Sequence, residues 1–139
     1  MADQKTKILL VEDEEMLANM YEVKFQNEGF ILIKALDGMQ GLELGKQEKP
    51  DFILLDIIMP KMDGFSVLKS LKEDPATKAI PVMLLTNLGQ DEDVKRGKEL
   101  GSVGYLVKAN VTPSEVVDAV KKEIAKWANV VKRSGAKLN

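Results

Sequence analysis

The feature that most constrains the fold of this chain is an alternation of short apolar runs with segments of helical period. Five runs of strand length recur along the 139 residues: ILLV from Ile8, FILI from Phe30, FILL from Phe52, VMLL from Val82 and YLV from Tyr105. Such apolar runs, separated by helix-length segments, are typical of parallel strands with helices over both faces. The sequence therefore predicts one α/β domain, doubly wound in three layers around a five-stranded parallel sheet.

The segments between these runs are expected to be amphipathic helices. The residues that share an expected apolar face are Leu17, Met20, Tyr21 and Phe25; Val94 and Leu100; and Val116, Val120, Ile124 and Trp127. The segment around Met39 and Leu42 is a weaker candidate, because Gly38, Gly41 and Gly45 lower its helix propensity. The last helix begins with a capping box, in which Thr112 caps, Pro113 takes the first position and Glu115 follows.

Composition narrows the chemistry that the chain can perform. Neither cysteine nor histidine is present, which excludes disulfides, zinc–thiolate sites, imidazole metal sites and Ser-His-Asp catalysis. The net charge of −2 does not favour a nucleic-acid partner. No signal peptide is recognisable, and no apolar run approaches the roughly 20 residues of a membrane span. We therefore expect a cytoplasmic protein without direct membrane or nucleic-acid binding, whose reactive groups are carboxylates, hydroxyls and lysines.

Polar or charged residues follow four of the five apolar runs. They are Glu12 and Asp13 after the first run, Asp56 after the third, Thr86 at the end of the fourth and Lys108 after the fifth. In an open parallel sheet the carboxyl ends of the strands share one edge, where ligands bind. Asp56 is the most informative of them, because an ionised carboxylate next to a buried strand is costly without a partner. The sequence thus predicts a convergent site at this edge.

Three carboxylates at one edge repel one another unless a cation or protons neutralise them. Oxygen ligands of this kind favour Mg²⁺, which binds one or two carboxylates and is commonly shared with a phosphoryl group. Lys108 and the Thr86 hydroxyl could hold such a group from the other side. The chemistry therefore indicates that Asp56 is a carboxylate nucleophile for a phosphoryl group.

Four segments, ILLVEDE, DFILLDIIMPKMDGF, IPVMLLT and GYLVK, occur in this order and spacing. Together they resemble the receiver domain of two-component response regulators, of the stand-alone CheY-like type, from about Lys7 to about Ala125. The resemblance implies a flavodoxin-like sheet with strand order 2-1-3-4-5. We expect a receiver domain over residues 1–125 and, over residues 126–139, an extension of the last helix and a basic tail.

The same resemblance implies a role for each site residue. Asp56 would be the phosphoacceptor and a metal ligand, with Asp13 as a direct Mg²⁺ ligand, Glu12 as an acid that acts through water, and the Ile58 carbonyl as a further ligand. Thr86 would be the switch hydroxyl, Lys108 the phosphate-pairing lysine and Tyr105 the aromatic residue that changes rotamer. Ile58 and Leu88 would flank the path of attacking water, and because both are apolar we expect a long-lived phosphoryl state.

The function expected from this site is a phosphorylation-dependent signalling switch. A histidine kinase or phosphotransfer protein would donate the phosphoryl group, and a downstream protein would bind the face of the fourth helix, the fifth strand and the fifth helix. The chain would have only self-phosphotransfer and autodephosphorylation activity rather than being an enzyme. We expect a monomer or weak homodimer, and no DNA-binding module in this chain.

Two departures from the family pattern keep an alternative open. Asn87 follows Thr86 where the family usually has a small residue, and Ala109 follows Lys108 where proline, after a cis bond, is usual. We expect a trans Lys108–Ala109 bond, because a cis bond before a non-proline residue costs about 2.5 to 4 kcal/mol. The alternative is a phosphorylation-independent interaction module of receiver fold. Gly64, in KMDG, is interpreted as an ordinary turn glycine.

A related fold with a different activity has less support. A flavodoxin-like electron carrier would need a hydroxyl-rich phosphate loop after the first strand, and an aspartate-nucleophile phosphatase would need a second acid two residues after Asp56, where Ile58 stands. The sequence has neither feature.

The end of the chain, from Lys121, reads KKEIAKWANVVKRSGAKLN, which is basic and continues the apolar helical face. It is interpreted as a longer final helix with a frayed tail, or else as a partner-binding or dimerisation helix or a linker to an output domain.

Overall fold

The computed structural model describes residues 6–59, 62–87 and 89–133, with side chains up to residue 126. Its five strands are β1 (Lys7–Val11), β2 (Ile31–Ala35), β3 (Phe52–Leu55), β4 (Val82–Thr86) and β5 (Gly104–Val107). All neighbouring strands pair in parallel, in the order β2-β1-β3-β4-β5. The predicted strands and the predicted order of the sheet are confirmed.

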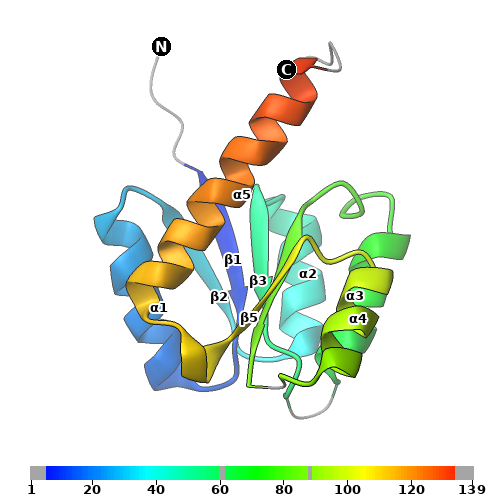
Figure 1. Cartoon of the computed structure of the whole chain (residues 1–139), viewed down its shortest axis with the longest axis horizontal. Coiled ribbons are helices and arrows are strands. Elements are labelled where there is room, and N and C mark those ends of the chain that lie inside the picture. The colour runs from blue at the N-terminus through cyan, green and yellow to red at the C-terminus, as the bar shows by residue number, and fades with distance from the viewer. Residues whose placement is uncertain (1–5, 60–61, 88, 134–139) are drawn as a thin grey trace.

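The helices lie on both faces of this sheet (Figure 1). They are α1 (Glu15–Asn27), α2 (Gly38–Glu48), α3 (Gly64–Glu73), α4 (Asp91–Glu99) and α5 (Pro113–Arg133), with a 3-10 turn, η1, at Lys108–Asn110. Helices α1 and α5 cover one face, and α2, α3 and α4 cover the other. The three-layer, doubly wound architecture predicted from the apolar runs is therefore confirmed.

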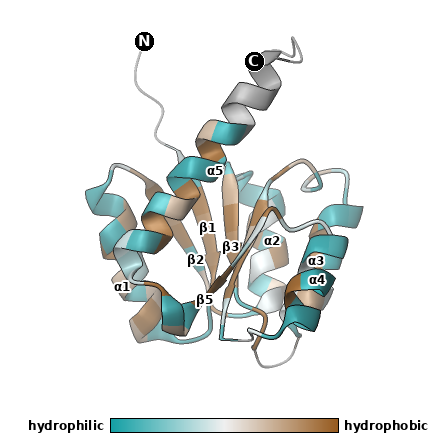
Figure 2. Cartoon of the chain, viewed as in Figure 1, coloured by the Kyte–Doolittle hydropathy of each residue, from teal (hydrophilic) through white to brown (hydrophobic). Residues whose placement is uncertain are grey.

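The sheet separates two apolar cores. One core joins alternate strand residues to α1 and α5, with Phe25 and Val120 among its fully buried members. The other joins the opposite strand face to α3, with Val67 and Leu68 fully buried. Figure 2 shows the apolar residues concentrated in the strands. The central strands β3 and β4 are buried along their whole length, which makes their carboxyl ends a rigid support.

Helix α2 forms in spite of its three glycines, and its geometry shows what they do. Gly38, Gly41 and Gly45 are the buried residues of this helix. A Cβ atom added at Gly41 would lie 2.9 Å from a methyl carbon of Val11 on β1. Gly41 thus allows α2 to approach the sheet closely, and Gly38, where an added Cβ would lie 2.7 Å from a methyl carbon of Val67, allows it to approach α3. This packing offsets the low helix propensity of the glycines.

The apolar face predicted for α1 is wrong at Met20, which is 45% exposed. The residues of α1 that are buried against the sheet are Ala18, Tyr21 and Phe25. Met20 lies outside this stripe, because the buried residues recur at spacings of three and four along one side of the helix. In the sequence, Met20 could not be distinguished from the apolar residues of α1 that pack against the sheet.

Helix α5 begins at the predicted capping box. The Glu115 backbone N–H donates to the Thr112 hydroxyl at 3.2 Å, and the Thr112 N–H donates to Glu115 Oε1 at 2.8 Å. The helix runs without interruption to Arg133 and extends beyond the sheet in Figure 1. The Trp127 side chain and residues 134–139 lie outside the described part. Within that part, no helix is both long and apolar enough to cross a bilayer.

Candidate functional site

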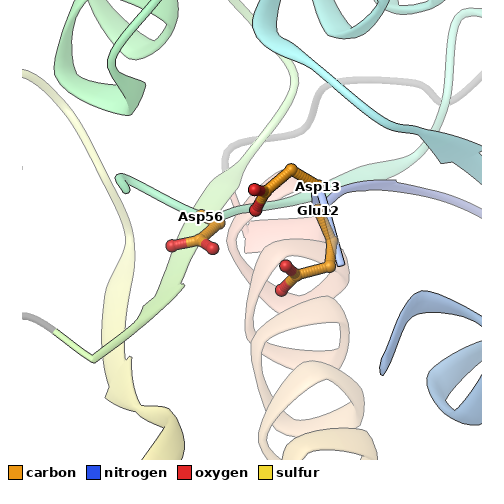
Figure 3. Close-up of side chains that lie close together, drawn as sticks. All are labelled: Glu12, Asp13 and Asp56. Carbon is orange, nitrogen blue, oxygen red and sulfur yellow. The ribbon is translucent and has the colours of Figure 1, made fainter. Parts of the chain in front are cut away.

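Backbone hydrogen bonds place two acids at the carboxyl edge of the sheet. The Glu12 N–H donates to the Ala35 carbonyl at 2.9 Å, and the Asp56 N–H donates to the Val11 carbonyl at 3.0 Å. Each acid therefore stands directly beyond a strand whose hydrogen-bond ladder continues into it. Asp13 follows Glu12, and Figure 3 shows the three carboxylates close together. Each of the three offers a carboxylate oxygen, and these oxygens all lie within 4.8 Å of one another.

The three acids differ in their exposure. Glu12 is 1% exposed and Asp56 is 4% exposed, whereas Asp13 is open to solvent. Burial raises the pKa of Glu12, although hydrogen bonds from Lys108 and from the Glu14 N–H act in the opposite direction. Buried carboxylates at this separation need a positive partner, as the sequence predicted.

Lys108 supplies that partner. Its Nζ lies 2.8 Å from Asp56 Oδ2 and 2.5 Å from Glu12 Oε1, and its side chain is only 12% exposed. Burial alone would lower the pKa of Lys108, but the hydrogen bonds to Asp56 and Glu12 outweigh it and raise that pKa. The bond to Ala109 is trans. Both the trans bond and the reach of Lys108 to Asp56 were predicted and are confirmed.

The other oxygen of Asp56 is fixed by its own loop. Asp56 Oδ1 accepts a hydrogen bond from the Ile58 N–H at 3.1 Å, and the Ile57 carbonyl accepts one from the Gly64 N–H at 2.8 Å. A Cβ atom on Gly64 would lie 2.4 Å from both the Asp56 carbonyl oxygen and Ile57 Cα. The interpretation of Gly64 as a turn glycine is therefore wrong. It is the first residue of α3, and it allows that helix to contact the backbone of Asp56.

Thr86 and Tyr105 lie on the two strands nearest to Lys108. Thr86 is the fully buried last residue of β4 and pairs with Val107, the residue before Lys108. Tyr105 lies on β5 opposite Leu84 and is half-buried. Burial raises its pKa to about 12, with smaller contributions from the charges of Asp93 and Asp56. The predicted hydroxyl thus stands at the carboxyl edge of the sheet, while the phenol lies farther back on its strand.

A cavity of about 180 Å³ opens beside Asp56 and Lys108 at the carboxyl edge of the sheet. The residues that line it are Asp13, Glu14, Asp56, Ile58, Asn87 and Lys108. Ile58, predicted as a carbonyl ligand, is 53% exposed at its wall. Sequence reasoning missed Glu14, whose N–H donates to Glu12 Oε2 at 3.1 Å. Its only sequence signal was its place directly after two acids.

The sequence and the fold both match known proteins. Residues 8–121 match the response regulator receiver domain family. The transcriptional regulator RpaA of Synechocystis is 37% identical over 102 residues, which are 73% of this chain and 42% of RpaA. Protein PilH of Pseudomonas aeruginosa is also 37% identical over 102 residues, 73% of this chain and 84% of PilH. The chain belongs to the response regulator receiver domain family.

Solved receiver structures agree with this assignment. The chemotaxis protein CheY4 of Vibrio cholerae superposes with a TM-score of 0.80 at 28% identity, over 86% of this chain and 98% of that protein. The chain spans less than half of the length of several relatives that it matches, RpaA among them. Receiver domains of this family act in two-component signalling, and they interact with histidine kinases or phosphotransfer proteins and with downstream targets.

Family members bind Mg²⁺ at an acidic pocket, and the residues of this receiver domain suit that ion. Asp13 is exposed to the cavity and Asp56 lines it beside Asp13. Carboxylate oxygens are hard ligands, and Mg²⁺ needs only one or two of them because it retains several waters. The donor set therefore fits Mg²⁺.

The two departures from the family pattern are in contact with each other. Asn87 Oδ1 accepts a hydrogen bond from the Ala109 backbone N–H at 3.1 Å. A proline at position 109 has no N–H and could not make this bond. Both residues were identified from the sequence, but they were interpreted as two independent departures from the family pattern. Asn87 and Ala109 form one structural feature of the cavity wall.

Proposed function

We propose that this receiver domain is a phosphorylation-dependent switch in which Asp56 accepts a phosphoryl group from the phosphohistidine of a kinase or phosphotransfer protein. The observation that carries the proposal is the environment of Asp56. Its carboxylate is held between the Ile58 N–H and the Lys108 ammonium, beside the exposed acid Asp13 and at the floor of an open cavity. A fixed carboxylate that faces a cavity with a cation beside it is suited to nucleophilic attack on phosphorus.

The residues divide the chemistry between them. An Asp56 carboxylate oxygen forms the new bond to phosphorus while the bond from phosphorus to the donor nitrogen breaks. Lys108 offsets the charge of the phosphoryl oxygens, and the Ile58 N–H holds the orientation of the carboxylate. Asp13, Asp56 and the Ile58 carbonyl would hold Mg²⁺, with Glu12 acting through water, and the bound ion would supply further positive charge.

The acyl phosphate formed at Asp56 carries a charge of about −1.5 to −2, in place of the single negative charge of the carboxylate. That charge competes with Glu12 for the Lys108 ammonium, which contacts both acids before the reaction. Thr86, at the end of the adjacent strand β4, is the hydroxyl that turns toward the phosphoryl group, and Tyr105 follows it. Because Thr86 leads toward α4 and Lys108 toward α5, the downstream target binds the face formed by α4, β5 and α5.

The switch resets by hydrolysis, and the domain has no other enzymatic activity. Ile58 lies at the cavity wall and its side chain cannot orient an attacking water molecule. The phosphoryl group therefore persists for minutes or longer in the purified protein. Leu88, the other residue expected beside this path, lies outside the described residues.

The test is phosphorylation with acetyl phosphate and Mg²⁺, followed by intact-mass measurement. Wild type should gain one phosphoryl group that hydroxylamine removes, and Asp56→Asn should gain none. Asp63→Asn is the matched control, because Asp63 caps α3 nearby and asparagine caps a helix equally well. Labelling that persists in Asp56→Asn would show that the acceptor is another residue.

One observation favours the alternative, an interaction module that works without phosphorylation. The Lys108 ammonium already compensates Glu12 and Asp56, so the site is stable without a phosphoryl group. In that case folded wild type would gain no phosphoryl group from acetyl phosphate or from any histidine kinase. It would still bind its target, and Asp56→Asn would bind that target equally well.

A further inference from the structure

Asn87 connects two segments that both end at the cavity. It follows Thr86 at the end of β4, its side chain is exposed, and it lines the cavity together with Lys108. Its Oδ1 accepts the Ala109 N–H, and Ala109 is the second residue of η1, directly after Lys108. The Thr86–Val107 pair ends the β4–β5 ladder. The Asn87–Ala109 hydrogen bond is the next link beyond that ladder.

The position of this link matters because of the shape of lysine. The ammonium stands at the end of a flexible four-carbon chain, so its location depends on how firmly the backbone of Lys108 is held. The Lys108 backbone is the start of a three-residue 3-10 turn on an edge strand, which by itself is a weak constraint. A hydrogen bond to the very next peptide N–H restricts the orientation of that turn, and it reduces the entropy lost when the ammonium is placed.

We propose that Asn87 is a positioning residue for Lys108. Through the Ala109 N–H it holds the η1 turn so that the Lys108 ammonium reaches both Asp56 and Glu12. This inference rests on the proposed function for its effect on phosphorylation, although the contact itself exists without it. Asn87 acts through the backbone of the neighbouring segment and does not act by narrowing the cavity.

The first experiment needs no phosphoryl donor. Amide hydrogen exchange at Ala109, followed by NMR, should become about three- to tenfold faster in Asn87→Ala, as expected for the loss of one hydrogen bond. Asn110→Ala is the matched control, because it removes the same carboxamide from an exposed position of the same turn. Unchanged exchange at Ala109 in Asn87→Ala would overturn the inference.

The second experiment separates positioning from side-chain size. Asn87→Leu keeps a similar volume but has no acceptor, whereas Asn87→Ala loses both. With acetyl phosphate and Mg²⁺, both variants should show a rate constant at saturating donor that is about three- to tenfold lower, with little change in the donor concentration for half-maximal rate. If Asn87 instead narrows the cavity, Asn87→Leu behaves as wild type and Asn87→Ala reacts faster, which would contradict the proposal.

A double-mutant cycle with Lys108→Met completes the test. If Asn87 acts only through Lys108, then Asn87→Ala has no further effect on the rate in the Lys108→Met background. A loss of equal size in both backgrounds would mean that Asn87 contacts the phosphoryl group itself, and the positioning role would fail. If folded wild type gains no phosphoryl group at all, the proposed function fails, while Ala109 exchange still decides whether Asn87 holds the turn.

Discussion

The two sides of the cavity are held in different ways. On the acid side, Glu12 and Asp56 directly follow the buried strands β1 and β3, and their backbone N–H groups continue the sheet ladders. On the lysine side, Lys108 and Asn87 lie beyond the ends of β5 and β4, and a hydrogen bond from the Ala109 N–H to the Asn87 side chain joins the two segments. The acid side therefore depends on the whole core, whereas the lysine side depends on a few local contacts.

This difference suits a switch. Strands buried on both faces do not move without loss of core packing, so the acids keep their positions. The lysine side can change its arrangement at the cost of a few hydrogen bonds, each with a net contribution of about 1 kcal/mol. Variants that disturb one side and spare the other can test this division, and the largest effect is expected where the two sides meet.

Lys108→Met removes the contact between the two sides. It leaves the carboxylates of Glu12 and Asp56 buried without their cation, and the expected loss in the free energy of unfolding is about 3 kcal/mol at neutral pH without Mg²⁺. Urea unfolding monitored by circular dichroism measures this loss. Lys126→Met is the control, because it removes an exposed lysine from α5. An equal, small loss in both variants would show that the cavity ion pairs contribute no net stability.

The pH dependence of Lys108→Met follows from Glu12. The folded-state pKa of Glu12 is raised by burial, and removal of Lys108 takes away contributions that lower it. A carboxyl group with a raised pKa gives a stability contribution that is present at low pH and is lost as pH rises through that pKa. The deficit of the variant should therefore shrink as the pH falls from neutral and Glu12 becomes protonated. A deficit that stays constant or grows as the pH falls would contradict this assignment.

Gly64→Ala tests the acid side alone. Helix propensity by itself predicts stabilisation by about 1 kcal/mol, because alanine is the better helix former. The added Cβ would instead meet the Asp56 carbonyl at 2.4 Å, so we expect a net loss of about 2 kcal/mol in the free energy of unfolding.

Gly29→Ala is the control for Gly64→Ala. Gly29 has a φ of 91° but open space around it, so alanine there tests backbone strain without a steric clash. Denaturant melts of both variants provide the measurement. If Gly64→Ala is no less stable than wild type, then α3 does not restrain the backbone of Asp56.

Asp13→Ala distinguishes the effect of bound Mg²⁺ on stability from the effect of the protein chain itself. For wild type at a Mg²⁺ concentration ten times the dissociation constant, the expected stabilisation is about 1.4 kcal/mol. Asp13→Ala should lose most of this Mg²⁺ dependence, and without metal it should be at least as stable as wild type because one of three crowded acids is gone. Thermal melts with and without Mg²⁺ measure both quantities, with Asp118→Ala on α5 as the control. The same Mg²⁺ dependence in Asp13→Ala would place the ion elsewhere.

The same division explains what could be predicted from the sequence. The acid side follows from strand periodicity, because a strand fixes where its next residue stands. That is why Glu12, Asp13 and Asp56 converge as predicted. The contact of the Lys108 ammonium with Asp56 could also be predicted, since β5 ends at the same edge of the sheet.

The parts that the sequence did not predict depend on contacts between loops or on the shape of a packed surface. The Asn87–Ala109 hydrogen bond joins residues 22 positions apart, and the sequence around each residue does not show how the two segments are oriented. The role of the α2 glycines was missed because helix propensity describes an isolated helix, whereas Gly41 packs against Val11. The wrong assignment of Gly64 has the same origin, because only the fold brings the backbone of Asp56 against it.

The smallest expected effect tests whether the lysine side is also held from its far end. Thr112 caps α5 three residues after Ala109, and Thr112→Ala should lower the free energy of unfolding by about 1 kcal/mol. Ser114→Ala is the control, since Ser114 is an exposed residue of the first turn of α5. Because the acid side does not depend on this cap, the Mg²⁺ affinity of Thr112→Ala should equal that of wild type, whereas Ala109 amide exchange should become faster. Weakened Mg²⁺ binding together with the lost stability would mean that the positions of the acids also depend on the loop after β5. The two sides of the cavity would then not be held independently.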